Sequence, residues 1–181
     1  MLNPHNNLSL GKILRSRGMN RNRPLDEYNR DLGLDIQAMA KKSVEEKGLF
    51  SWYDLCCGYF VARSELLSEV SSIAEKIEVV GVDLDVRAEG VEFGNASNFP
   101  IRGNVDLVTC LQGLDHIETY IRRGAESVQN WYNRMQEGAT LSFDVANRHI
   151  LVLGQDLPLY LMDELGDKVE LFPTPEREDT H

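Results

Sequence analysis

The sequence has few cysteines, and their spacing does not suit a metal site or a disulfide framework. Cys56, Cys57 and Cys110 are the only three among 181 residues, and no CxxC pair occurs. Neighbouring cysteines rarely bridge each other, because a disulfide needs two well-separated Cα atoms. The four histidines stand far apart in the sequence, which leaves a structural zinc site poorly supported. We therefore expect three reduced core thiols and no bound metal.

Long apolar runs are also missing. No stretch of about 18 apolar residues occurs, so we expect no transmembrane helix. The first residues lack the apolar core of a secretory signal, which favours a cytoplasmic location. Positive charge is scarce as well, since the net charge is -10. This balance argues against a surface that serves as a whole to bind nucleic acid.

The charge is unevenly distributed along the chain. Residues 1–30 contain six basic and two acidic side chains, whereas residues 156–181 contain eight acidic and two basic ones. We interpret residues 1–23 as a basic N-terminal arm, 24–172 as a single domain and 173–181 as a flexible acidic tail. The simplest interpretation is that both charged ends are exposed to solvent. The alternative, an arm that holds an anionic acceptor or RNA, is less favoured because interleaved aromatic residues are missing.

Helical and strand patterns alternate through the domain. Apolar residues recur every three to four positions in four segments and predict helices over 24–48, 60–77, 117–138 and 157–165. Apolar or β-branched runs predict strands over 49–55, 78–83, 91–93, 105–110, 140–145 and 168–172. This alternation predicts a Rossmann-like α/β fold, with a mostly parallel sheet and helices on both faces. Ligands bind such sheets beyond the carboxyl ends of the strands, where the strand order reverses.

A tight turn follows the first predicted strand. It reads Asp54-Leu55-Cys56-Cys57-Gly58-Tyr59-Phe60 and resembles the DLGCGxG turn of the class I S-adenosylmethionine-dependent methyltransferases. Cys56 and Phe60 replace the first and last glycines of that pattern. The cysteine side chain at position 56 is small enough to leave most of the space that glycine would leave for a ligand. The Phe60 ring has two alternatives, because it either presses on the ligand pocket or packs inward against the sheet.

Further segments of this resemblance follow in order between Trp52 and Val145, about half the chain. Residues 79–83 (VVGVD) resemble the family's GVD segment, and residues 94–96 (GNA) its GDA segment. Residues 106–117 (DLVTCLQGLDHI) resemble FDLVxxxxVLHHI, and residues 138–141 (GATL) resemble GGTL. Each piece alone is weak, but several pieces in order at strand ends favour this family.

The resemblance implies S-adenosylmethionine as cofactor and assigns its contacts. Asp54 would hold the ligand's ammonium group, directly or through water, and Asp83 the ribose hydroxyls. Asn95 would offer its carbonyl to the adenine amino group, although Gly-Asn is equally an ordinary turn pair. His116 is either a general base for the acceptor or a partly buried loop histidine. The cofactor-binding positions implied are Asp54, Cys56, Gly58, Asp83, Leu84, Asn95, Ala96 and Leu111.

Two departures from the family pattern are expected to shorten the fold. Only residues 84–90 separate the second and third strands, too few for the usual crossover helix. Seven extended residues reach about 23 Å, enough to recross a short strand, and the N-terminal helix could cover the face left open. The chain is also too short for the final antiparallel hairpin. One sheet edge is therefore either exposed or paired with a second copy or another protein.

Three functions remain to be distinguished. The first is methyl transfer to a small-molecule acceptor, since the Asn-Pro-Pro-Tyr and Asp-Pro-Pro-Tyr motifs of base-amine methylation are missing. The second is an inactive relative that acts through a partner protein, which the replaced glycines and the shortened fold favour. The third, a nicotinamide-dependent oxidoreductase, is weaker because the turn lacks GxGxxG. Fold alone does not choose among them.

Overall fold

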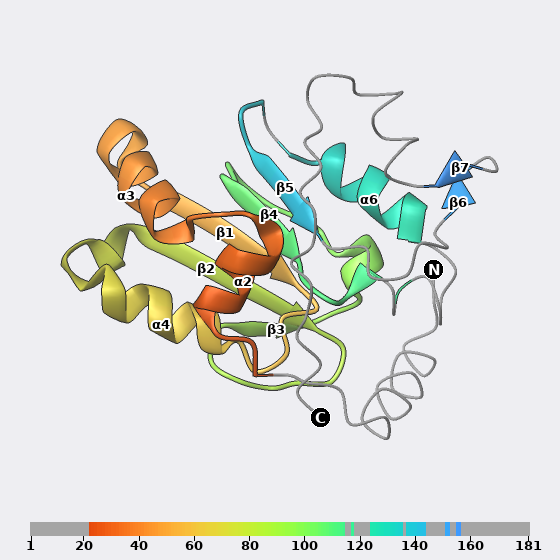
Figure 1. Ribbon diagram of the computed structural model, residues 1–181, viewed down its shortest axis with the longest axis horizontal. Coiled ribbons are helices and arrows are strands. Elements are labelled where there is room, and N and C mark those ends of the chain that lie inside the picture. The colour runs from red at the N-terminus through yellow and green to blue at the C-terminus, as the bar shows by residue number, and fades with distance from the viewer. Residues whose placement is uncertain are drawn as a thin grey trace.

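Five strands form one parallel sheet in the computed structural model, which describes residues 22–114, 117, 124–135, 137–143, 151–152 and 155–156. The strands are β1 (Phe50–Leu55), β2 (Ile77–Asp83), β3 (Val91–Phe93), β4 (Leu107–Cys110) and β5 (Thr140–Phe143). Their order is β3-β2-β1-β4-β5, and every pair is parallel (Figure 1). The predicted Rossmann-like α/β class is confirmed.

The strand order reverses at β1. This strand pairs with β2 on one side and with β4 on the other, and Asp54 lies opposite both Gly81 and Thr109. In an open parallel sheet the crevice for a ligand forms beyond the carboxyl ends of the strands at such a reversal. The turn that follows Leu55 therefore begins at the position where this fold binds ligands.

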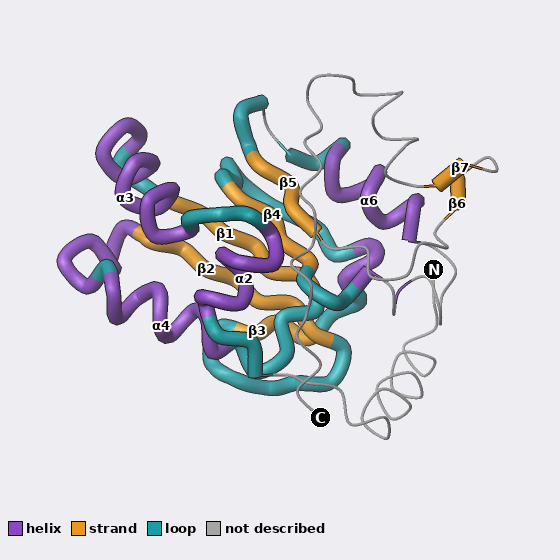
Figure 2. The backbone as a smooth tube through the Cα atoms, in the orientation of Figure 1, coloured by secondary structure: helices purple, strands orange, loops and turns teal. Residues whose placement is uncertain are grey.

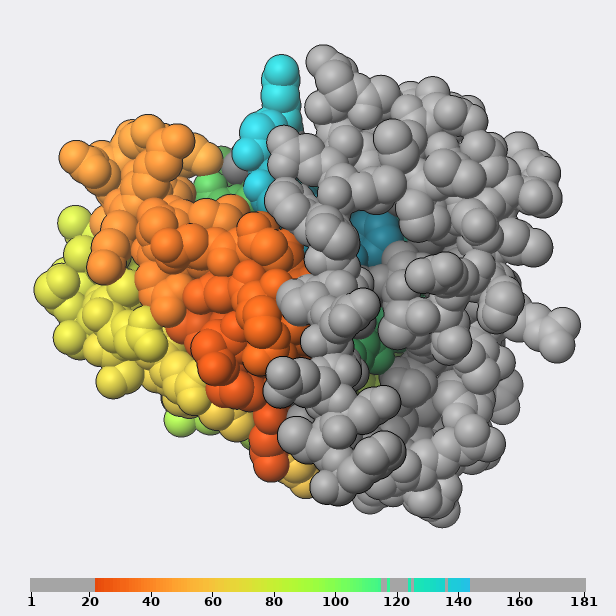
Figure 3. Space-filling model, in the orientation of Figure 1, coloured from red at the N-terminus to blue at the C-terminus, as the bar shows by residue number. Residues whose placement is uncertain are grey.

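Helices cover both faces of the sheet. On one face lie α2 (Leu25–Leu32), α3 (Ile36–Lys47) and α4 (Val61–Glu69), followed by the 3-10 helix η1 (Ser71–Lys76). On the other lie α6 (Gly124–Tyr132) and the 3-10 helix η2 (Ala96–Asn98) (Figure 2). Figure 3 shows α2, α3 and α4 meeting in one continuous surface.

The two cores follow from the alternation of side chains along each strand. Phe50 and Trp52 are buried on the side of α2, α3 and α4, whereas Tyr53 and Leu55 are buried on the side of α6. Successive residues of a strand point to opposite faces. Asp54 therefore has the same orientation as Trp52 and points towards α2.

The predicted N-terminal helix over residues 24–48 is wrong, because the structure has two helices there. Gly33 adopts a left-handed conformation with φ 64° and ends α2. Asp35 begins α3, since its carboxylate accepts a hydrogen bond from the Ala38 amide at 2.9 Å. Glycine after the last turn and aspartate at an N-cap are strong helix boundaries. They outweigh the continuous apolar stripe on which the prediction rested.

The crossover between β2 and β3 contains no helix, as the sequence predicted. The Gly81 amide donates to the Gly90 carbonyl at 2.8 Å and fixes the far end of the crossover against β2. Arg63 of α4 fills the space beside Gly90, where an added Cβ would meet its side chain at 2.5 Å. Ser142 of β5 donates to the Leu32 carbonyl at 3.4 Å. The cover over the crossover thus comes from α4, while α2 reaches towards β5.

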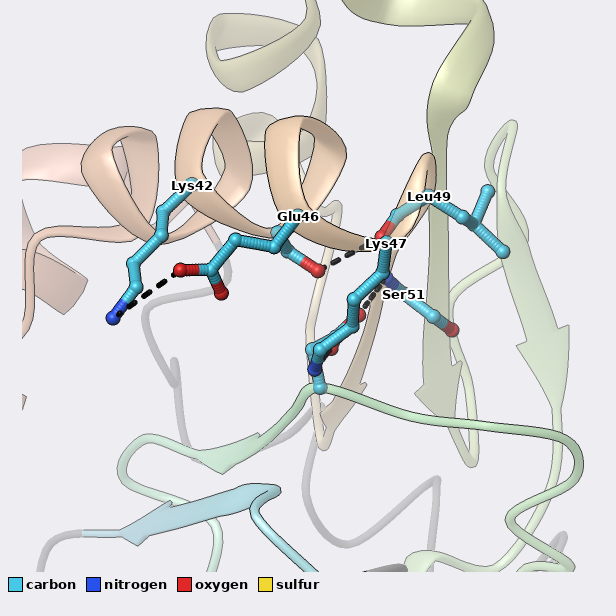
Figure 4. A network of polar contacts seen from close by, with 7 residues as sticks. Lys42, Glu46, Lys47, Leu49 and Ser51 are labelled. Carbon is cyan, nitrogen blue, oxygen red and sulfur yellow. Dashed lines mark hydrogen bonds and ion pairs between the residues drawn. The ribbon is translucent and has the colours of Figure 1, made fainter.

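A polar cluster fixes the opposite end of the strands. Lys47 of α3 forms an ion pair with Asp106 at 2.7 Å, and the Ser51 amide donates to the same carboxylate at 2.9 Å. The Ser43 hydroxyl donates to the Leu49 carbonyl at 2.8 Å (Figure 4). These contacts join α3 to the amino end of β1 and to the residue before β4. They stabilise the end of the sheet away from the expected ligand crevice.

Several predicted segments lie outside the described residues. They are residues 1–21 of the basic arm, the helix over 157–165, the strand over 168–172 and the tail over 173–181. Within the described part, β6 (Leu151–Val152) and β7 (Gln155–Asp156) pair antiparallel, separately from the five-stranded sheet. None of the described helices has both the length and the apolar character needed to cross a membrane.

Candidate functional site

The turn after β1 keeps a glycine-like backbone where glycine is missing. Cys56, Gly58 and Phe60 have φ angles of 68°, 61° and 57°, all in the left-handed region. This conformation costs a residue other than glycine about 1–2 kcal/mol. Both replaced glycines of the resemblance are therefore strained positions of this turn, and Gln112 after β4 is the third such residue in the described part of the chain. The shape of the turn is retained although the residues that make it easy to form are not.

The Phe60 ring packs inward, which decides between the two alternatives for this side chain. It is 2% exposed and lies edge-to-face against Trp52, with ring centroids 5.5 Å apart. An added Cβ on Gly81 would come within 2.6 Å of this ring and of the Cys57 sulfur. The glycine in β2 thus makes room for Phe60. Burial raises the pKa of the Cys57 thiol, so that this cysteine is an inert core residue.

The ends of three strands meet at Asp83. Its Oδ2 accepts a hydrogen bond from the Gly58 amide at 3.1 Å, and its Oδ1 accepts from the amides of Asp85 and Val86 at 2.9 and 3.1 Å. Its own carbonyl accepts from the Gly94 amide at 3.0 Å. A carboxylate offers about four acceptor positions. Three are used by the backbone, which leaves room for about one further donor such as a ribose hydroxyl.

Asp54 lies inside the protein in a network of hydroxyl groups. It is completely buried. The Tyr28 hydroxyl donates to its Oδ2 at 2.5 Å and the Thr109 hydroxyl to its Oδ1 at 2.7 Å. The Thr109 oxygen accepts in turn from the Trp52 indole nitrogen at 2.8 Å. Both carboxylate oxygens predicted to hold a ligand's ammonium group are thus bound by α2 and β4.

Burial raises the pKa of Asp54 to about 6, although the charge of Arg23 and the hydrogen bonds from Tyr28 and Thr109 lower it. The compensating charge comes from Arg23, which is 5% exposed. Its Nε donates to the Tyr28 oxygen at 3.4 Å, and its Nη2 donates to the carbonyl of Cys56. The residue predicted to end a loose basic arm is therefore a buried cation beside the turn.

Periodicity gives no signal for Arg23, Tyr28 or Thr109 as partners of Asp54. Tyr28 and Thr109 occupy apolar positions of a helix and a strand, where a hydroxyl is not expected to matter. The only signal is the pair Arg23-Pro24, since proline before a helix fixes the chain at the helix start. That pair holds Arg23 where α2 enters the domain.

Asn95 has one polar atom in use and one without a partner. It is 7% exposed, and its Oδ1 accepts from the Ser97 amide at 3.0 Å and from the Ser97 hydroxyl at 2.9 Å. Its Nδ2 is buried and has no hydrogen-bond partner among the described residues. The group left for a ligand is therefore a donor, whereas the sequence predicted a carbonyl acceptor.

The remaining predicted residues have different surroundings. Ala96 is buried, and its carbonyl accepts from the indole nitrogen of Trp131 at 2.8 Å, which makes Trp131 a packing residue of α6. Leu111 is completely buried in the core below α2, α3 and α4. Leu84 is partly exposed beside Asp83. His116 lies outside the described residues, and its role stays a prediction.

Solved structures provide similarities of fold. A sugar N-methyltransferase, KedS8 from a Streptoalloteichus species, is 18% identical with a TM-score of 0.46, and the match covers 78% of this chain and 55% of that one. An S-adenosylmethionine-dependent methyltransferase from Clostridium acetobutylicum is 20% identical with a TM-score of 0.40, over 65% and 54%. DesVI from Streptomyces venezuelae is 13% identical with a TM-score of 0.40, over 73% and 54%.

The chain spans just over half the length of each of these three proteins. No protein-family model and no curated protein matches it. The candidate site consists of the turn from Cys56 to Phe60, Asp83 and Asn95, with Asp54 and Arg23 behind the turn.

Proposed function

We propose that this protein is an S-adenosylmethionine-dependent methyltransferase that acts on a small-molecule acceptor. One observation carries the proposal. The turn from Cys56 to Phe60 has a left-handed backbone at each position where the family that it resembles has glycine. The Gly58 amide in this turn donates a hydrogen bond to Asp83. Strained residues concentrate at functional sites, because the surrounding structure must hold them there. This turn lies where the strand order reverses.

The adenosyl part of the ligand would lie along the ends of β2 and β3. Asp83 has room to accept about one ribose hydroxyl, and Leu84 follows it directly. The buried Nδ2 of Asn95 would donate to a nitrogen acceptor of the adenine ring, with Ala96 beside it. A buried donor without a partner costs about 1–3 kcal/mol. A base that accepts this hydrogen bond would recover that free energy.

The amino-acid part would lie at the turn. The amino end of α4 has a partial positive charge that suits the ligand's carboxylate. Asp54 and the Cys56 carbonyl would face its ammonium group, although Tyr28, Thr109 and Arg23 hold these acceptors in the structure. Leu111 is buried in the same core as Cys57 and Phe60, so its contribution would be to support the turn.

The bound cofactor supplies a methyl group on a sulfonium sulfur. Methyl transfer from such a group is an in-line displacement, for which positioning and exclusion of water provide much of the rate. The chain therefore needs few catalytic side chains. His116 remains our proposed general base, because it follows β4 and a histidine there can remove a proton from an acceptor nucleophile.

A second function is favoured by a different observation. Both oxygens of Asp54 and the carbonyl of Cys56 are bound by the protein's own side chains. If this arrangement is permanent, the chain keeps the fold without binding the cofactor and acts through a partner protein.

Calorimetric titration separates these functions. We expect S-adenosylhomocysteine to bind with a sub-millimolar Kd and NAD to give no heat. Asp83→Ala should weaken the binding of S-adenosylhomocysteine at least about tenfold, which corresponds to one lost hydrogen bond to a charged group. Glu92→Ala, an exposed acid on β3, is the matched control and should leave the Kd unchanged. No heat with either S-adenosylmethionine or S-adenosylhomocysteine would favour the partner-protein function.

A further inference from the structure

Arg23 is a buried cation whose contacts converge on the end of β1. Its Nη2 donates to the Cys56 carbonyl, and its Nε donates to the Tyr28 hydroxyl, which itself donates to Asp54. Arg23 is 5% exposed and Asp54 is completely buried. A buried carboxylate requires a compensating charge or hydrogen bonds, because leaving it unpaired in the interior is costly. Arg23 supplies that charge from the protein itself.

Arg23 occupies one acceptor that a ligand's ammonium group would need, the Cys56 carbonyl. It is linked to the other, the Asp54 carboxylate, through the Tyr28 hydroxyl. An ammonium ion has three donors and no acceptor, so it requires carbonyl or carboxylate oxygens. At the end of β1 these are the Asp54 carboxylate and the Cys56 carbonyl. Two cations beside one buried carboxylate repel each other. A ligand's ammonium group can therefore bind here only if the guanidinium group moves away.

We propose that Arg23 is a specificity-determining residue that closes the amino-acid end of the cofactor site, and that the ligand's ammonium group replaces it on binding. This proposal rests on the proposed function. The site thus exchanges one cation for another, and the charge of Asp54 is compensated both with and without ligand. The free-energy cost of moving Arg23 weakens the binding of ligands that carry an ammonium group. It does not affect the binding of ligands without one.

Three ligands that share the adenosine and the sulfur atom isolate this effect. S-adenosylhomocysteine carries an ammonium and a carboxylate, its decarboxylated analogue carries only the ammonium, and 5′-methylthioadenosine carries neither. The variant is Arg23→Met, which keeps a long, flexible side chain and removes the charged guanidinium group. Arg30→Met, an exposed arginine of α2 paired with Asp31, is the matched control.

We expect Arg23→Met to tighten the binding of S-adenosylhomocysteine and of its decarboxylated analogue by about tenfold, the equivalent of one charge-assisted hydrogen bond that is no longer displaced. The Kd of 5′-methylthioadenosine should change less than twofold, and Arg30→Met should change none of the three. Equal effects on all three ligands would overturn the proposal. Weaker binding of S-adenosylhomocysteine alone would also overturn it, since Arg23 would then bind the ligand's carboxylate.

Removing Arg23 leaves Asp54 buried without its cation, and the single variant can fail to fold for that reason. The double variant Arg23→Met/Asp54→Asn removes both charges and serves in that case. It should bind 5′-methylthioadenosine like the natural protein and lose any preference for a ligand with an ammonium group. A retained preference would overturn the proposal. If none of the three ligands binds the natural protein or any variant, the proposed function itself fails, which is a different result.

Discussion

The Tyr28 hydroxyl donates a hydrogen bond to Asp54 at 2.5 Å and thereby joins α2 to the carboxyl end of β1. Burial raises the pKa of Tyr28 well above its ordinary value, and the charge of Asp54 raises it further, so the phenol remains a donor at any physiological pH. The same ring lies edge-to-face against Trp52 at 5.6 Å. The helix that enters the domain is thus fixed to the strand that ends at the candidate site.

Tyr28→Phe should lower the free energy of unfolding by about 1–3 kcal/mol. The substitution keeps the ring packing and leaves one oxygen of a buried carboxylate without its donor. Urea unfolding followed by fluorescence measures the change. Tyr59→Phe is the control, because Tyr59 is 53% exposed and should change stability by less than about 0.5 kcal/mol. Equal effects of the two substitutions would contradict a stabilising role for the Tyr28 hydroxyl.

The pKa of Asp54 makes stability depend on pH in an unusual direction. The pKa in the folded protein is about 6, above the value of 3.8 in an unfolded chain. Between these values Asp54 binds more protons in the folded state than in the unfolded state, so its contribution to stability is greatest below pH 4 and falls as the pH rises through 6. The loss from this group is at most roughly 3 kcal/mol, because each pKa unit corresponds to about 1.4 kcal/mol.

Asp54→Asn removes this dependence, whatever its effect on absolute stability. The difference in free energy of unfolding between Asp54→Asn and the natural protein should shift in favour of the variant as the pH rises from 4 to 6.5. Urea unfolding at closely spaced pH values measures that difference. A constant difference over this range would mean that Asp54 does not titrate there.

Substitutions of Phe60 test whether side-chain packing or backbone conformation has the larger effect on stability at this position. Phe60→Ala should destabilise the protein by about 3–5 kcal/mol, the usual cost of removing a buried aromatic ring. Phe60→Gly removes the same ring but relieves the left-handed strain at φ 57°. It should therefore be about 1 kcal/mol more stable than Phe60→Ala. Thermal unfolding of the two variants gives the comparison, and the reverse order would show that the turn is not strained at this residue.

Gly81 and Phe60 should be coupled energetically. Gly81→Ala adds a methyl group within 2.6 Å of the Phe60 ring, and overpacking of this kind costs about 1–3 kcal/mol. In the Phe60→Ala background the clash with the ring is gone and only the Cys57 sulfur stays within 2.6 Å, so the cost should be smaller. A double-mutant cycle measures this coupling, and additive effects would contradict the contact.

The sheet was predictable because each strand carries its own signal. Runs of apolar or β-branched residues separated by helical stripes predict β1, β2, β4 and β5 within a few residues, and the short interval before Val91 predicts the missing helix. Apolar periodicity does not show the break between α2 and α3, since Leu32 and Ile36 continue one apolar stripe across it. The capping residues Gly33 and Asp35 give the correct signal.

The place of the candidate site in the fold follows from the motif register, but the contacts within it do not. Motif register places Gly58, Asp83 and Asn95 at neighbouring strand ends, and the bond between Gly58 and Asp83 agrees with that register. The partners of Asp54 come from residues 26 positions before it and 55 after it, Tyr28 and Thr109. Such pairings depend on how helices lie on the sheet, which a single sequence does not specify.

We propose that an adenosyl ligand binds where Gly58, Asp83 and Asn95 come together. Nuclear magnetic resonance of 15N-labelled protein during titration with S-adenosylhomocysteine tests it most directly. We predict that the largest shifts occur at the amides of Gly58 and Gly94 and at the side-chain amide of Asn95, and that Asn95→Leu removes the last of these signals and weakens binding. Saturating ligand that leaves these three signals unmoved, or that shifts only residues elsewhere in the fold, would contradict the account.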